Sequence, residues 1–282
     1  MIIALFTDFG TRDAYVAQLK GAILSLHPTV QLADLTHEVE AFDVRAAAYL
    51  LDAAARYFPA GTIFVGVVDP GVGTARRPLL LVTQADKFYV GPDNGLCTRV
   101  IEREGLKAVY VLTQSTYFLR QVSATFHGRD IFGPVAAHLA RGVEPAQFGP
   151  RIEDIVRLSY TRPQRVGETI TGEILHLDHF GNIATNIPAA MCTDFTPGQT
   201  VACTCAEHTQ VISFVETYGT GPQDELVCLI NSNDEFEIAL PYGAASAQLG
   251  VKVGERVRVE RYGLPVYRRT GSVPSGDTRL SP

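Results

Sequence analysis

Polar side chains that could do chemistry follow the predicted strand ends in the first half of the chain. The motif Thr-Asp-Phe-Gly, residues 7–10, stands at the end of the apolar run at residues 2–7, and Asp8 is its carboxylate. In open α/β sheets ligands bind at the carboxyl ends of strands, where a carboxylate can accept hydrogen bonds from both ribose hydroxyls. Gly10 stands alone, without the further glycines of a phosphate-binding loop. The pattern favours a nucleoside without phosphates over NAD or ATP as the ligand. The alternative interpretation of Asp8 is a helix-capping or turn residue.

A second cluster follows the third predicted strand, at residues 68–77. Asp69 ends the strand, and a proline and two glycines then force a tight turn that lets backbone approach a ligand closely. Arg76 can fold back onto Asp69, which would keep that carboxylate ionised and oriented. The alternative interpretation is a surface turn that carries a salt bridge.

A third cluster, at residues 126–130, opens a predicted helix. It contains His127 beside Arg129 and Asp130. A histidine at such a junction can be partly exposed and titrate near neutral pH, although a lone histidine is more often structural.

In the second half of the chain, residues 177–186 are dense in polar groups. There the Asn182 amide could read an adenine edge, and Asp178 could hold an ammonium group.

These clusters sit on an alternation of strand and helix patterns in a predicted N-terminal domain at residues 1–163. Apolar runs at 2–7, 30–35 and 63–68 predict strands, and further strands are expected at 79–82 and 108–112. Helical spacing begins at Tyr15, at Val44 and at Phe132. This order predicts a Rossmann-like α/β domain, with a mostly parallel sheet covered on both faces.

The pattern changes after a link at about residues 162–167. Short alternating segments separated by turn residues predict a small antiparallel β-barrel domain at 168–267. The last stretch, 268–282, is rich in Arg, Ser, Gly, Thr and Pro, and we expect a mobile tail there.

Composition limits the classes of function. The chain has 282 residues and a net charge of −6, which disfavours nucleic acid as a partner. We expect no membrane partner, because no apolar run approaches the roughly 20 residues that span a bilayer. The N-terminus indicates a first strand and not a signal peptide. The five cysteines match no zinc or disulfide framework, so we expect small core residues in a cytoplasmic protein.

Taken together, the motifs TDFG, DPGVGTARR, GPDNG, TFHGRDIFGP and DHFGNIATNI, in that order, make the chain similar to one known family. From Met1 to about Val266 it resembles the S-adenosylmethionine (SAM) hydroxide adenosyltransferases, relatives of the fluorinating and chlorinating enzymes that also use SAM. The resemblance implies an α/β domain followed by a β-barrel, and a homotrimer with ligand sites at subunit interfaces. It also implies that Asp69, Arg76 and His127 handle the water.

The resemblance further assigns residues that bind the substrate. Asp8 matches the ribose-binding carboxylate. Phe42 matches an aromatic residue that packs against the ligand, and Asp178 matches the residue that holds the methionine amino group. Asn182 matches an adenine contact, and Tyr218 matches a ring along the adenine. Ser232 matches a position near the methionine carboxylate.

The predicted function is hydrolysis of SAM to adenosine and methionine, by attack of water on the ribose 5′-carbon. We expect neither metal nor cofactor, because a sulfonium needs no Lewis acid to leave. One alternative is a halogenating enzyme of the same family. The intact Asp-Arg-His set and the short stretch at 85–91 favour water. Asn233 stands where those relatives place an arginine, which leaves the anchor of the methionine carboxylate unassigned. The other alternative is a non-catalytic sensor of SAM or adenosine.

Overall fold

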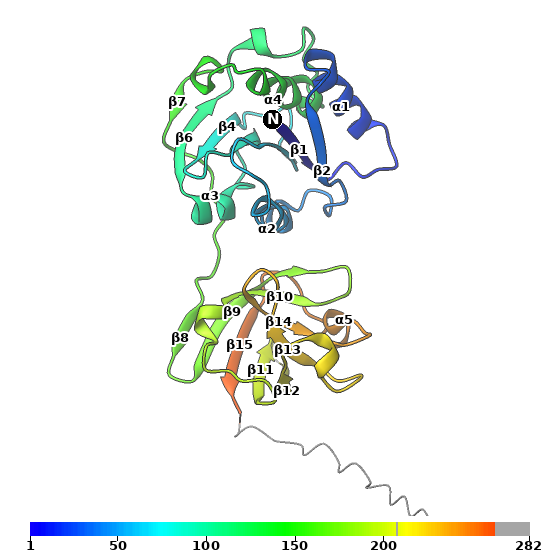
Figure 1. Ribbon diagram of the computed structural model, residues 1–282, viewed down its shortest axis with the longest axis vertical. Coiled ribbons are helices and arrows are strands. Elements are labelled where there is room, and N and C mark those ends of the chain that lie inside the picture. Colours follow the sequence, from blue (N-terminus) through cyan, green and yellow to red (C-terminus); the bar gives the residue numbers. More distant parts are fainter. Residues whose placement is uncertain (207, 263–282) are drawn as a thin grey trace, which may run out of the picture. The chain divides into compact units, whose positions relative to one another are not determined.

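A computed structural model of the chain describes residues 1–206 and 208–262 and divides into two compact units (Figure 1). The first unit runs from Met1 to Tyr160, and the second begins at Thr161. The tail expected at 268–282 lies outside the described residues. Within the described part, no helix combines the length and the apolar character needed to cross a membrane.

The first unit is built on a seven-stranded sheet in the order β2-β1-β3-β5-β4-β6-β7. Strands β1, β2, β3 and β5 pair in parallel, and β6 has the same direction because it and β5 are both antiparallel to β4. Only β4 and β7 run the other way. The predicted mostly parallel sheet is therefore confirmed. The strands are β1 (Ile2–Thr7), β2 (Gln31–Thr36), β3 (Ile63–Val67), β4 (Pro78–Thr83), β5 (Phe88–Pro92), β6 (Leu106–Val111) and β7 (Arg151–Ile152).

Helices cover both faces of this sheet, as the alternation of elements predicts. Side chains on a strand point alternately to opposite faces, and β1 shows it: Ile3 and Leu5 join one buried cluster, and Ala4 and Phe6 join the other. Helices α1 (Tyr15–Leu26) and α4 (Gly133–Ala140) contribute to the first cluster. Helices α2 (Val44–Ala55) and α3 (Thr98–Glu104) contribute to the second.

Strand β5 is absent from the sequence-based prediction. Its residues include Gly91 and Pro92, which are poor strand formers. Gly91 is required by packing, because a Cβ built there would lie 2.3 Å from the carbonyl oxygen of Gly66 on β3. Such a close approach of two backbones cannot be read from local propensity.

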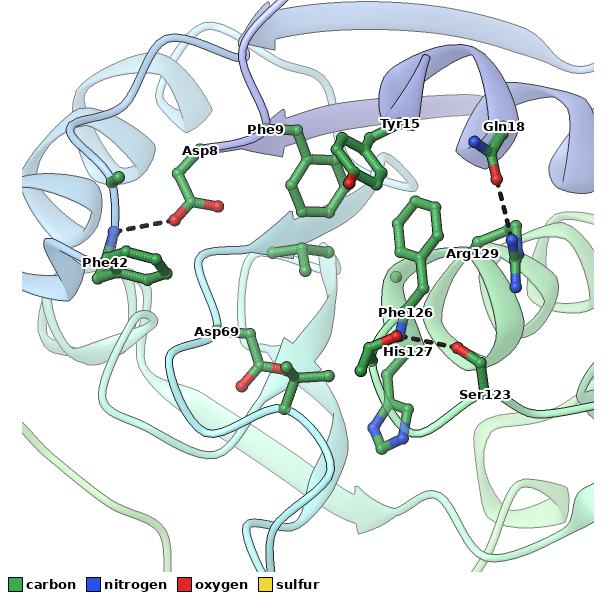
Figure 2. Close-up of a pocket in the computed structure, with 15 residues that line it drawn as sticks. Asp8, Phe9, Tyr15, Gln18, Phe42, Asp69, Ser123, Phe126, His127 and Arg129 are labelled. Atoms are coloured by element: carbon green, nitrogen blue, oxygen red, sulfur yellow. Dashed lines mark hydrogen bonds between the residues drawn. The ribbon is translucent and has the colours of Figure 1, made fainter. Parts of the chain in front are cut away.

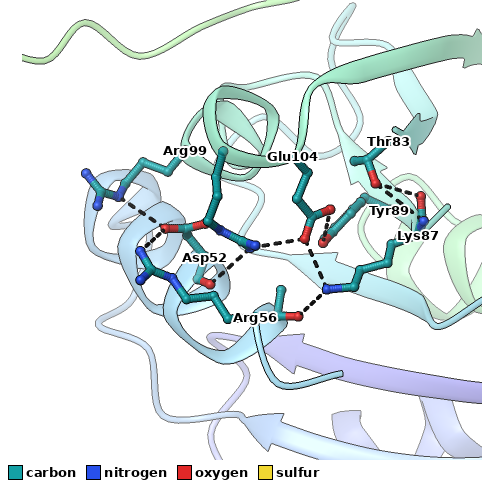
Figure 3. A network of polar contacts seen from close by, with 9 residues as sticks. Asp52, Arg56, Thr83, Lys87, Tyr89, Arg99 and Glu104 are labelled. Atoms are coloured by element: carbon teal, nitrogen blue, oxygen red, sulfur yellow. Dashed lines mark hydrogen bonds and ion pairs between the residues drawn. The ribbon is translucent and has the colours of Figure 1, made fainter. Parts of the chain in front are cut away.

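A buried polar network ties β5 to α2 and α3 on one side of the sheet (Figure 3). Lys87 donates to the carbonyl of Ala55 at 2.6 Å and pairs with Glu104 at 3.1 Å. Asp52 of α2 pairs with Arg103 of α3 at 2.6 Å. Since buried charges are tolerated only when paired, this network holds α2 and α3 together on this face of the sheet, next to the start of β5.

The second unit is a closed barrel. Seven strands follow the order β10-β14-β13-β12-β11-β15-β9, a β9–β10 pairing closes the ring, and β8 extends β9. All pairs are antiparallel except β12–β13. The predicted C-terminal barrel is confirmed. Its elements are β8 (Gln164–Val166), β9 (Thr169–Leu177), β10 (Ile183–Pro188), β11 (Thr200–Cys205), β12 (His208–Phe214), β13 (Val227–Ile230), β14 (Glu235–Ala239), α5 (Ala245–Leu249) and β15 (Arg256–Arg261).

Candidate active site

A cavity of about 630 Å³ opens in the first unit, within the size range of small-molecule sites (Figure 2). Asp8, directly after β1, and Asp69, two residues after β3, both line it. Because β1 and β3 are adjacent and parallel, their carboxyl ends bring these carboxylates to one edge of the sheet. The cavity is also lined by Phe9, Tyr15, Phe42, Phe126 and His127.

Arg76 joins Asp69 to His127. Its Nε donates to both carboxylate oxygens of Asp69, at 2.9 and 3.0 Å, and its Nη2 donates to Oδ2 as well. The same Nη2 lies 2.9 Å from His127 Nδ1. The side chains of Arg76 and Asp69 are only 9% and 5% exposed. Burial strengthens such charge-assisted bonds, so the three side chains form one fixed unit.

Two local features bring this unit together. Gly73, in the turn after β3, has φ +75°, and a Cβ there would lie 2.3 Å from the carbonyl oxygen of Ala124. Only glycine therefore lets this turn pack against the segment that carries His127. Beyond His127 the chain forms one π-helical turn, Gly128–Phe132, before α4 begins. Single π-helical turns occur frequently at functional sites.

The arginine also decides the protonation of His127. A guanidinium can only donate hydrogen bonds, so Nδ1 of His127 accepts and the ring's proton is on Nε2. The pKa of His127 is lowered, first by burial and then by the positive charge of Arg76, which outweigh the opposing effect of Asp69 and Asp130. His127 is thus a neutral imidazole with one donor, Nε2–H.

Asp8 fixes the backbone of Phe42. Its Oδ2 accepts from the Phe42 N–H at 3.0 Å, and the other oxygen points into the cavity (Figure 2). Phe42 has φ +68°, in the left-handed region that non-glycine residues rarely adopt, and the residue is 68% exposed. Strained backbone of this kind clusters at ligand sites. Phe42 therefore presents a ring beside a carboxylate that retains accepting capacity.

The second unit has its own cavity, of about 650 Å³, lined by Asp178, Asn182, Tyr218 and Phe180 among others. Asp178 accepts from the backbone N–H of Asn182 at 2.8 Å and from its side-chain amide at 2.9 Å. Asn182 is buried, and its orientation is set by Asp178. Three of the four predicted substrate residues of the second half thus line one cavity, while Ser232 is not among the residues that line it.

A carboxylate that sequence analysis missed organises this region. Glu237, only 5% exposed, accepts from the Tyr218 hydroxyl at 2.6 Å and from the Asn231 amide at 3.1 Å. Burial raises its pKa. Asn231 Oδ1 in turn accepts from the N–H groups of Asn233 and Glu235, which holds the turn that contains Ser232. Glu237 therefore links Tyr218 to that turn.

Three aromatic residues of the first cavity were also missed as site residues. Phe9 and Phe126 stand next to Asp8 and His127 within the recognised motifs, which is the signal that could have found them. The spacing of Tyr15 predicts a helix and gives no sign of a site residue. Tyr15 is the first residue of α1, is 49% exposed and lines the cavity.

Comparison with known proteins shows the family of this chain. The SAM hydroxide adenosyltransferase N-terminal domain matches residues 3–149, and the C-terminal domain of the same name matches residues 172–258. The chain belongs to the SAM hydroxide adenosyltransferase family. Both matched regions contain the residues described above.

Individual relatives carry two different names. The chain is 38% identical to a protein of Salinispora tropica named (R)-S-adenosyl-L-methionine hydrolase, over 91% of this chain and 97% of that protein. A fluorinase of an Actinoplanes species is 34% identical, over 66% of this chain and 71% of its own. A crystal structure of an uncharacterized conserved protein from Thermotoga maritima superimposes with a TM-score of 0.88 at 36% identity, covering 93% of this chain and all of that one.

Proposed function

We propose that this protein hydrolyses SAM to adenosine and methionine. The observation that carries the proposal is the buried Asp69–Arg76–His127 unit at the edge of a cavity that also contains Asp8. Similarity to proteins named (R)-S-adenosyl-L-methionine hydrolase over most of both chains supports it. The fluorinase match covers a smaller part of this chain, so hydrolysis is favoured over halogenation.

In the proposed complex, Asp8 accepts hydrogen bonds from the ribose hydroxyls, and the Phe42 ring packs against the ligand. A carboxylate oxygen offers two acceptor positions, so the bond from Phe42 N–H leaves capacity for a diol. Asp69 and His127 then hold one water in line with the ribose 5′-carbon. Methionine leaves as a neutral thioether, so no acid has to assist its departure.

The two groups act on the water differently. His127 donates Nε2–H to the water oxygen, and an Asp69 oxygen accepts a water proton, which leaves a lone pair directed at the 5′-carbon. As the C–O bond forms, the C–S electron pair passes to sulfur, and one water proton passes to Asp69 and then to solvent. The products are adenosine, methionine and a proton. A carboxylate suffices as the base, because the attacking water becomes strongly acidic as it loses electron density.

Positioning contributes more than basicity in this scheme. General base catalysis is typically worth about 10²- to 10⁴-fold, whereas holding the reacting groups together can lower the barrier by up to roughly 7–11 kcal/mol. Arg76 serves the positioning, since it fixes Asp69 and His127 at once. No step requires a metal or a cofactor, and SAM is the substrate.

We extend the proposal to the second unit and to the assembly. There Asp178 holds the methionine amino group, Asn182 and Tyr218 contact the adenine, and Ser232 lies near the methionine carboxylate. We also propose a homotrimer with substrate sites at subunit interfaces, as the family resemblance implies. Light scattering on the purified chain tests the trimer by its mass.

We also place the protein in the cytoplasm, since all five cysteines are free thiols.

A product assay tests the activity. The protein is incubated with SAM in ¹⁸O-labelled water, with and without chloride, and the products are measured by mass spectrometry. The proposal expects methionine and adenosine with ¹⁸O at the 5′ position, both formed about 10²- to 10³-fold more slowly in His127→Ala. A chloride-dependent 5′-chloro nucleoside would make the protein a halogenating enzyme. Tight binding of SAM with no product would make it a sensor.

A further inference from the structure

Three aromatic rings form one wall of the cavity in the first unit. Phe9, Tyr15 and Phe126 contact one another with ring centroids 5.4 to 6.1 Å apart and with tilted or edge-to-face geometry. All three line the cavity. We refer to them as the aromatic wall. The hydrolytic roles above account for none of these rings.

The place of the wall follows from its chain neighbours and from the view of the cavity. Phe9 adjoins Asp8, and Phe126 adjoins His127. In Figure 2 the three rings lie on the side of β1 and α1, whereas Asp69 and the His127 imidazole lie on the other side of the cavity. In-line displacement puts the leaving sulfur opposite the attacking water. A water held by Asp69 and His127 therefore directs the sulfur toward the aromatic wall.

Charge in the cavity also suits a cation. Arg76 is bonded to Asp69, and Arg129 is bonded to the fully buried Asp130 at 2.6 Å, so these pairs are neutral overall. Asp8 remains as a negative charge. An aromatic face attracts a cation, more strongly where water is excluded.

Of the three rings, Tyr15 is the one whose face can contact a cation. The Phe126 ring already carries the Arg129 guanidinium 4.9 Å from its centroid. Tyr15 is 49% exposed and lines the cavity, whereas Phe9 packs partly buried against the adjoining core. We propose that the aromatic wall, through Tyr15, receives the sulfonium of SAM and makes the site select a cationic sulfur over a neutral one. This inference rests on the proposed function, because it takes SAM as the ligand.

The reaction makes the effect separable from catalysis. The sulfur is fully charged in bound SAM and loses charge as the C–S bond breaks. A cation–π contact therefore stabilises the ground state at least as much as the transition state, which improves binding without raising kcat. Removal of the ring should weaken SAM binding and leave kcat unchanged or slightly higher.

The test compares two substitutions and two ligands. Tyr15→Phe keeps a ring, and Tyr15→Leu replaces it with an aliphatic side chain. For each protein we would measure kcat and KM for SAM, and the inhibition constant of S-adenosylhomocysteine, which lacks the sulfonium methyl and its charge. The selectivity is the ratio of that inhibition constant to KM. The proposal expects it to fall about 5- to 30-fold in Tyr15→Leu and to stay within about 2-fold in Tyr15→Phe.

Other outcomes overturn the inference. Tyr15→Leu could instead weaken the binding of SAM and S-adenosylhomocysteine by the same factor, through a general distortion of the wall. The ratio would then stay unchanged, and the Tyr15 ring would be an apolar contact only. Equal losses in Tyr15→Phe and Tyr15→Leu would assign the effect to the hydroxyl. If the wild-type protein forms no adenosine, the proposed function fails; the same ratio is then measured from the two dissociation constants by calorimetry.

Discussion

The role of His127 as a donor, and not as a base, gives the most discriminating prediction. Arg76 Nη2 occupies His127 Nδ1, so the imidazole can offer the water only Nε2–H. Glutamine places an amide N–H near the position of Nε2 and loses the bond to Arg76. Asparagine places a carbonyl near Nδ1, where it can accept from Arg76, but has no donor that reaches the water.

Magnitudes follow from that geometry. Loss of one preorganised donor costs about 10²- to 10³-fold in kcat, which we expect for His127→Ala and His127→Asn. His127→Gln keeps a donor and should lose only about 10-fold, because the donor is held less firmly. A general base would be worth about 10²- to 10⁴-fold and could not be replaced by an amide.

The assay is the initial rate of adenosine formation at saturating SAM, between about pH 5 and 8. Protonation of His127 would break its bond from Arg76 and place two cations together. Since its pKa lies below the ordinary 6.5, wild-type kcat should fall only in the acid part of this range. His127→Gln should lack that acid limb. A folded His127→Gln protein that is as inactive as His127→Ala would refute the donor assignment and make the imidazole a proton acceptor.

Three further predictions use matched variants. Gly73→Ala should lose most activity and unfold at lower temperature, because its Cβ meets the Ala124 carbonyl at 2.3 Å; Gly61→Ala, with φ +80° and no atom within 4 Å, should cost only about 1 kcal/mol of stability and keep kcat. Equal activity in these two variants would show that the close approach does not position Arg76. Glu237→Gln should raise KM for SAM about 3- to 10-fold with kcat nearly unchanged, because the Tyr218 and Asn231 contacts loosen. Glu173→Gln, at an equally buried barrel carboxylate that accepts from Thr161 N–H, should leave KM unchanged, and a matching rise there would contradict a positioning role. Finally, because the pKa of His127 is lower in the folded state than in the unfolded chain, the unfolded chain binds more protons between the two values. The contribution of His127 to folding stability is complete above about pH 6.5 and is lost as pH falls through its pKa in the folded state. Thermal unfolding should show a smaller acid loss in His127→Gln than in the wild type, and identical pH profiles would argue against the shift.

The sequence by itself determined the features that depend on near neighbours. The apolar runs of β1 and β3 and the helical spacing of α1 and α2 predicted the layered α/β unit, because side-chain period follows directly from backbone geometry. The turn after β3 likewise indicated that Arg76 could return to Asp69, since the two residues are only seven positions apart and the contact needs only that turn. The order of motifs indicated the family.

Tertiary structure decided which of these residues meet and what each one offers. Arg76 reaches His127, 51 positions away, only because Gly73 lets two loops touch, and that contact fixes the tautomer of the imidazole. Tyr15 fits the pattern of a core helix residue, yet it faces a cavity. Glu237 alternates with apolar neighbours like a solvent-facing strand residue, but it is buried. In each case the surroundings come from segments distant in the chain, so no local pattern contains them.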